Sequence, residues 1–175
     1  SRAAMKAAID EAHKHGMKAT GHLCSVTFAE AMDLGLDDFA HGVLTSTDFV
    51  TDKQADKCPT NNMKLADSLA SGDSPAAKAL IARMVKKGVS MTTTMPVYEA
   101  LYPHRPVTDE RSLELMAPEV RTAYVANRQF IDSASTWILT TGFSRALAFD
   151  KAFYAAGGLL GNGVDPTGNG GALPG

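Results

Sequence analysis

The sequence predicts an α/β fold in which parallel strands alternate with helices. Segments with the three- and four-residue spacing of amphipathic helices are separated by short apolar runs that are typical of buried strands. Parallel neighbours need a long crossover, usually a helix, so this alternation favours a parallel sheet. The near-continuous apolar runs predict a sheet that is buried on both faces. Two architectures remain open, namely an open four-stranded sheet and half of an eight-stranded (β/α)8 barrel, which usually needs ~250 residues.

The first part of the chain contains two helix–strand units. The apolar residues of the opening segment fall on one helical face, and Thr27 and Glu30 have the spacing of a capping box at the start of the second helix. Gly16 and Gly35 stand where a left-handed residue usually ends a helix. The expected elements are a helix at 2–15, a strand at 17–22, a helix at 27–35 and a strand at 36–41.

The rest of the chain contains two further units, interrupted by polar stretches. Residues 43–73 are rich in Thr, Ser, Asp and Asn and predict a long loop with one short helix around 63–70. Ser74 and Pro75 are favoured at the first positions of a helix, and the β-branched run before Pro96 is typical of a strand. The expected elements are a helix at 76–87, a strand at 89–95, an insertion at 97–136 with helices at 109–116 and 118–133, a helix at 143–156 and a strand at 159–164.

Composition excludes several classes of protein. The 175 residues are 45% hydrophobic and 21% charged, which is typical of a single globular domain. A formal net charge of −2 without a basic stripe argues against a nucleic-acid partner, and no apolar run approaches the ~20 residues of a membrane span. Cys24 and Cys58 lack CxxC spacing and are interpreted as two reduced thiols, which favours a cytoplasmic location.

Three residues with metal-binding side chains stand at the ends of predicted strands. His22 and His41 each end a strand, and Asp165 follows the last one. In a parallel α/β fold the carboxyl ends of the strands form one edge, where sites are commonly built. Imidazole and carboxylate groups are suitable ligands for Zn²⁺. The sequence therefore predicts a divalent-metal site made by His22, His41 and Asp165, with zinc as the favoured ion.

The same motifs resemble the metal-dependent amidohydrolase superfamily. Residues 12–22 resemble its fifth strand, in which a strand-end His binds metal. Residues 25–42, which end in His-Gly, resemble the following helix and sixth strand, and residues 160–171 resemble the eighth strand, whose Asp is the catalytic acid/base. By this resemblance the nearest subgroup is that of the imidazolonepropionase-like amidohydrolases.

The resemblance implies an activity and an architecture. Residues 1–175 would correspond to strands five to eight of a catalytic barrel that is truncated at both ends, lacks its N-terminal half and carries the insertion at 97–136. The intact enzyme would bind one or two zinc-type ions and hydrolyse carbon–nitrogen bonds other than ordinary peptide bonds, in small amide- or lactam-type molecules. Its metal-bound hydroxide would attack the carbonyl, with Asp165 as the proton shuttle. The chain alone is expected to be inactive, and its oligomeric state is open.

The chain also departs from the pattern of this superfamily. The His-x-His pair of the first strand has no counterpart on a strand here, because His13 and His15 are expected to face solvent at the end of a helix. The bridging Lys of the fourth strand has no candidate either.

Two other interpretations of the same residues remain. The chain could be a non-catalytic α/β binding module with structural histidines, or a phosphate-binding half barrel that uses the Gly-rich segment 161–171. A polar aromatic cluster after residue 96 is interpreted as an ordinary loop outside the site. It consists of Tyr98, Tyr102, His104 and Arg105.

Overall fold

The chain folds around a parallel sheet. The structure is a computed structural model that describes residues 1–59, 71–99, 102–104, 109–133 and 139–165. Its sheet has four strands in the order β1-β2-β3-β4, and every neighbouring pair is parallel. The strands are β1 (Thr20–His22), β2 (Asp38–Ala40), β3 (Ser90–Thr93) and β4 (Leu160–Asn162). The predicted α/β class with parallel strands is confirmed, whereas the helix expected around 63–70 lies outside the described residues.

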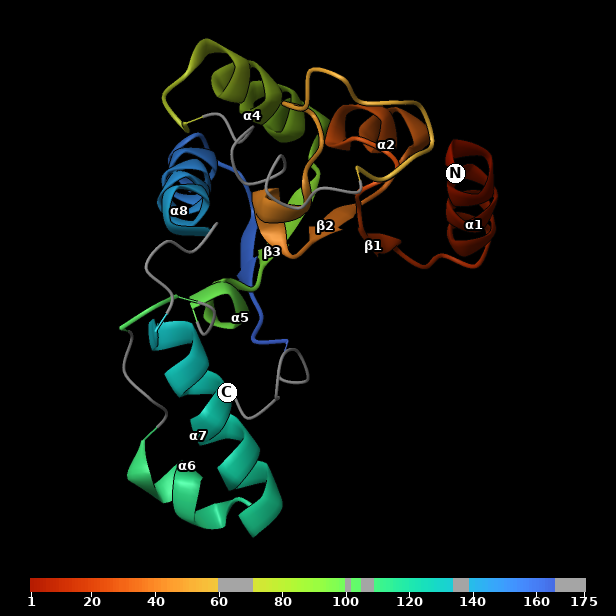
Figure 1. The fold of residues 1–175 in the computed structure, drawn as a ribbon. Coiled ribbons are helices and arrows are strands. Elements are labelled where there is room, and N and C mark those ends of the chain that lie inside the picture. Colours follow the sequence, from red (N-terminus) through yellow and green to blue (C-terminus); the bar gives the residue numbers. More distant parts are fainter. Residues whose placement is uncertain (60–70, 100–101, 105–108, 134–138, 166–175) are drawn as a thin grey trace.

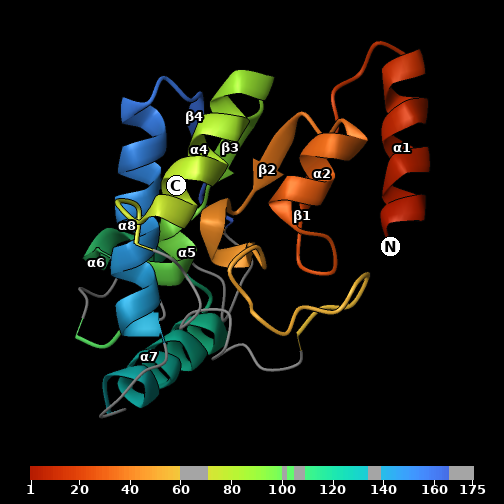
Figure 2. The same ribbon diagram turned by 90° about the horizontal axis from the view of Figure 1, so that it is seen from above.

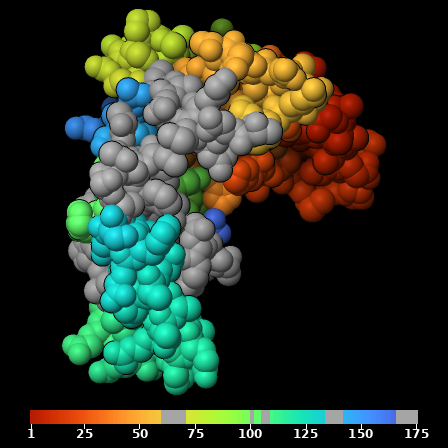
Figure 3. All heavy atoms as spheres, viewed as in Figure 1, coloured from red at the N-terminus to blue at the C-terminus, as the bar shows by residue number. Residues whose placement is uncertain are grey.

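The helices form two groups. In Figures 1 and 2, α1, α2, α4 and α8 follow one another around the outer side of the row of strands, while α5, α6 and α7 lie beyond the end of β3. Figure 3 shows α6 and α7 as a narrow projection from the body. No helix in the described ranges is long and apolar enough to cross a membrane. The helices are α1 (Arg2–Lys14), α2 (Phe28–Leu34), the 3-10 turn η1 (Gly42–Thr45), α4 (Pro75–Lys87), α5 (Met95–Glu99), α6 (Glu110–Leu115), α7 (Pro118–Ser133) and α8 (Leu139–Ala155).

Local capping signals fix where the helices begin and end. The Thr27 hydroxyl accepts the Glu30 N–H, and the Glu30 carboxylate accepts the Thr27 N–H, so the predicted capping box of α2 is confirmed. The Ser74 hydroxyl accepts the Ala77 N–H at the start of α4. Gly35 ends α2 with a left-handed backbone at φ 96°.

One hydrophobic core lies between the sheet and the outer helices. The rings of Phe28 on α2 and Phe39 on β2 stack with centroids 3.9 Å apart. Met91 of β3 is fully buried in the same cluster, to which α4 contributes Met84 and α8 contributes Phe149. Since α2, α4 and α8 share this one cluster, they cover the same face of the sheet.

The opposite face of the sheet is polar. The register places Thr20, Asp38 and Ser90 side by side on neighbouring strands. The Asp38 carboxylate accepts hydrogen bonds from the hydroxyls of Thr20 at 2.7 Å, Ser90 at 2.7 Å and Thr92 at 3.2 Å. The prediction of a sheet buried on both faces is therefore wrong. Along β3, buried and half-buried positions alternate, which is the pattern of a sheet with one covered face.

Several strands are shorter than the sequence predicts. Residues 17–19 do not join β1, because the Ala19 N–H is bound by the Asp37 carboxylate at 2.8 Å, and Met17 is 57% exposed. The predicted strand at 89–95 ends at Thr93, because Met95 already begins α5 with Pro96 in its first turn. Within the segment predicted to be an insertion, the helices expected at 109–116 and 118–133 are confirmed as α6 and α7.

A disulfide joins Cys24 to Cys58, with their Cα atoms 5.0 Å apart. Thr47 and Lys53 of the same loop also bind the turn after β1, donating to the carbonyls of Cys24 at 3.1 Å and Ser25 at 2.8 Å. The prediction of two reduced thiols is thus wrong, and the cytoplasmic expectation loses its support. The tertiary fold of this loop brings together two cysteines that are 34 residues apart in sequence.

Candidate functional site

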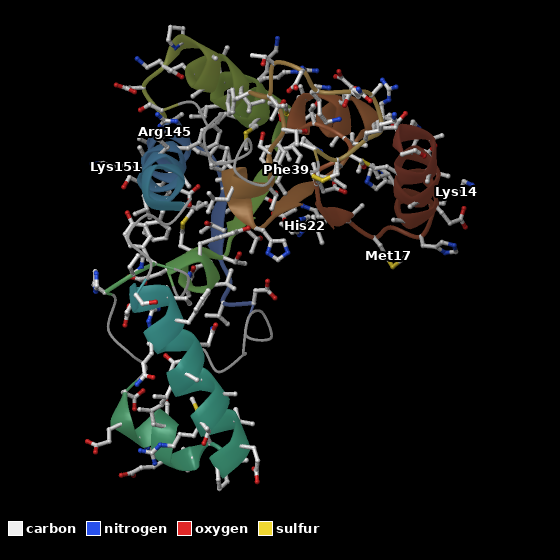
Figure 4. All side chains as sticks on the ribbon, in the orientation of Figure 1. Lys14, Met17, His22, Phe39, Arg145 and Lys151 are labelled. Carbon is white, nitrogen blue, oxygen red and sulfur yellow. A yellow bond between two sulfur atoms is a disulfide. The ribbon has the colours of Figure 1, made fainter. Side chains whose placement is uncertain are left out.

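The structure brings His22, His41 and Asp165 together at the carboxyl edge of the sheet. His22 is the last residue of β1, His41 directly follows β2, and Asp165 follows β4. The centroids of the two imidazole rings are 4.7 Å apart. His41 Nδ1 lies 3.6 Å from Asp165 Oδ2. Figure 4 labels His22 at the end of its strand. The three residues meet because the carboxyl ends of parallel strands share one edge.

A turn with a left-handed backbone positions the His41 side chain. Both His41 and Gly42 have left-handed backbones at φ 68°. A left-handed conformation costs a non-glycine residue about 1–2 kcal/mol, so the surroundings must hold it in place. A Cβ on Gly42 would lie 3.0 Å from Thr93 Oγ1, which makes glycine the residue that fits this turn against β3.

Thr94 is a site residue that the sequence reasoning missed. It directly follows β3, is only 5% exposed, and places its hydroxyl oxygen 3.1 Å from His41 Nδ1. Its position at the end of a predicted strand, on the same edge as the histidines, was the available signal. In sequence it was interpreted only as a β-branched strand former.

Burial and neighbouring charges act on the ionisable groups of the site. Burial lowers the pKa of His22, the positive form of His41 lowers it further, and Asp165 opposes both effects. The neutral imidazole that this favours is the form that binds metals. Burial raises the pKa of Tyr98 to about 12, and the negative charge of Asp165 acts in the same direction.

The residue types suit a zinc-type ion, but the set is incomplete. Two imidazoles and one carboxylate are ordinary ligands for such an ion. Within the described residues, however, no three His, Cys, Asp or Glu side chains are grouped so as to hold a metal ion. The described residues therefore supply candidate ligands but no complete coordination set.

Two other histidines, His13 and His15, do not join this site. His13 Nε2 lies 2.8 Å from the Asp37 carboxylate, at the amino end of the sheet. His15 Nε2 lies 3.1 Å from the Glu11 carboxylate. Tyr98 lies in α5 and packs against the core, so its interpretation as a loop residue is wrong. Arg105 and the glycines after Asp165 lie outside the described residues, as does the phosphate site predicted there.

The side chains at the carboxyl edge are the basis for assigning a function. Comparison with family models, curated proteins and solved structures found no match for this chain. The α/β class rests on the observed parallel sheet. The resemblance to amidohydrolases remains a prediction from the motifs.

Proposed function

We propose that this chain supplies one side of the active site of a metal-dependent hydrolase, which cleaves carbon–nitrogen bonds in small amide- or lactam-type molecules. The observation that carries the proposal is the convergence of His22, His41 and Asp165 at one edge. Imidazole and carboxylate groups on three different strand ends of a parallel sheet form an arrangement that suits hydrolytic metal chemistry.

The order of the strands supports a barrel-derived architecture. Each strand pairs with its neighbour in sequence, and the outer helices share one core on one face of the sheet. A doubly wound sheet would have helices on both faces. A row of consecutive strands with helices on one face is instead the layout of part of a (β/α)8 barrel. We therefore propose that the polar face, which carries Asp38, faces the inside of such a barrel.

Each residue has a role in this proposal. His22 and His41 would hold the ion through ring nitrogens, and Asp165 would complete their side of the site. A zinc-type ion lowers the pKa of a coordinated water toward ~7. The Asp165 carboxylate, which is 38% exposed, can accept a proton from water and return it to the leaving nitrogen. Further ligands must come from outside the described residues.

Zinc titration tests the proposal on the chain itself. Calorimetric titration of residues 1–175 with Zn²⁺ is expected to show one weak, exchangeable site. His22→Gln and His41→Gln should each weaken binding about tenfold or more. His15→Gln is the matched control, because His15 is 64% exposed and pairs with Glu11 outside the site. It should leave the affinity unchanged.

Two results would contradict this assignment. If zinc does not bind, or if His15→Gln weakens binding as much as the site variants, the metal site is refuted and the non-catalytic α/β module becomes the better interpretation. Hydrolysis of amides or lactams by residues 1–175 alone, measured as amine release, would contradict the proposal that this chain supplies only one side of the active site.

A further inference from the structure

We propose that Thr94 is a positioning residue that fixes the tautomer and the orientation of His41. This inference rests on the proposed function, in which His41 holds an ion through a ring nitrogen. It assigns a task to the residue that directly follows β3, the strand that supplies none of the three predicted ligands.

Thr94 has the burial and the geometry for this task. It is 5% exposed, and its hydroxyl oxygen lies 3.1 Å from His41 Nδ1, although the two residues are 53 positions apart in sequence. The preceding residue, Thr93, packs against the position of Gly42, where a Cβ would lie 3.0 Å from its hydroxyl. Two successive residues at the end of β3, Thr93 and Thr94, therefore lie against two successive residues of the left-handed turn.

The neighbours of Nδ1 determine which ring nitrogen carries the proton. A hydroxyl can donate or accept a hydrogen bond, whereas a carboxylate only accepts. A proton on Nδ1 can be donated to the Thr94 hydroxyl at 3.1 Å, so this tautomer depends on that hydroxyl for its hydrogen bond. The Asp165 carboxylate, at 3.6 Å, is too far from Nδ1 for a hydrogen bond and only attracts the proton electrostatically. The geometry therefore favours Nδ1–H, which leaves the Nε2 lone pair available as a ligand.

A hydrogen bond at the ring nitrogen that does not bind the ion is what a metal-binding histidine needs. The nitrogen that does not bind the ion usually donates to a fixed acceptor, and loss of that acceptor typically lowers metal affinity 10–100-fold. The Asp165 side chain is 38% exposed, whereas Thr94 is buried and directly follows β3. Thr94 is thus the better fixed neighbour of Nδ1.

The tautomer of His41 provides a direct test. In ¹⁵N-histidine-labelled protein at pH 8, long-range ¹H–¹⁵N spectra of the wild type should show His41 protonated on Nδ1. Thr94→Val removes the hydroxyl at similar volume and should shift His41 toward the Nε2–H form, while lowering zinc affinity about tenfold. Thr94→Ser should restore both. Thr92→Val is the matched control on the same strand, because the Thr92 hydroxyl binds Asp38.

The outcomes separate this inference from the proposed function. If Thr94→Val is folded by circular dichroism and His41 keeps the wild-type tautomer, the inference is overturned even though zinc still binds. If the tautomer changes in Thr94→Val and returns in Thr94→Ser while no variant binds zinc, Thr94 positions His41 but the metal assignment is wrong. A tautomer change in Thr92→Val equal to that in Thr94→Val would also overturn the inference.

Discussion

The buried carboxyl group of Asp150 makes the stability of this fold depend on pH. Asp150 lies on α8, is 6% exposed, and its Oδ1 has no hydrogen-bond partner in the described part of the chain. Burial raises its pKa from 3.8 to about 6, and the nearby Thr93 hydroxyl only partly opposes this effect. The folded state therefore holds a proton that the unfolded state releases between these two pH values.

The sign and size of the effect follow from that shift. Below pH 3.8 both states are protonated, and Asp150 adds no pH-dependent cost. As the pH rises toward about 6, the unfolded chain ionises first, so the free energy of unfolding falls. Because one pKa unit is worth 1.36 kcal/mol, the full loss above that pH is about 3 kcal/mol.

Asp150→Asn removes the ionisable group and should remove this loss. Urea unfolding at pH 4 and pH 8, followed by far-ultraviolet circular dichroism, measures the stability of the variant relative to the wild type. That difference should move in favour of the variant by about 2.4 kcal/mol from pH 4 to pH 8, because at pH 4 the unfolded carboxyl is already partly ionised. Any constant cost of burying the amide is the same at both pH values and cancels from this comparison.

Asp33→Asn is the control of opposite sign. Hydrogen bonds from Arg83 and Lys87 lower the pKa of the exposed Asp33 carboxyl from 3.8, so this variant should lose relative stability as the pH rises, mainly below pH 4 and only slightly between pH 4 and pH 8. The loss should be small and weakened by salt, because the pair is exposed. A stability difference for Asp150→Asn that stays flat between pH 4 and pH 8 would refute the reasoning about burial.

Two further predictions concern the loops that frame the site. Cys58→Ser should lower the free energy of unfolding in oxidising buffer by about 4 kcal/mol, because the disulfide closes a loop with a sequence separation of 34 residues. In urea unfolding, adding a reductant should lower the stability of the wild type to near that of the variant. Equal stability of the two proteins without reductant would show that the disulfide does not stabilise the fold. Gly16→Ala should lower the free energy of unfolding by about 1–2 kcal/mol, because Gly16 has a left-handed backbone at φ 68°. Gly42→Ala should lower it by more, because Gly42 has the same φ and its new Cβ would also contact Thr93. Equal losses in urea unfolding would contradict the contact with Thr93.

The sequence predicted that His22, His41 and Asp165 lie at one edge of the sheet, because strand ends are local features with a simple spatial rule. His22 and His41 each end a short strand, and a parallel sheet places such ends on one edge. The same rule places Thr94 at this edge, but its residue type does not single it out as a site residue. A threonine is common in strands, and its contact with His41 exists only once two segments 53 residues apart are paired through β2 and β3.

The sequence alone determined the helix termini that carry a capping signal, because the interactions that form such caps span only a few residues. The start of α8, predicted at residue 143 and found at Leu139, carries no such signal. The capping box of Thr27 and Glu30 and the left-handed end at Gly35 need no partner from elsewhere in the chain. Tertiary structure decided which face of the sheet is covered and which cysteines pair. Burial of a strand face depends on which helices pack against it, and the pairing of Cys24 with Cys58 depends on the path of the loop between them.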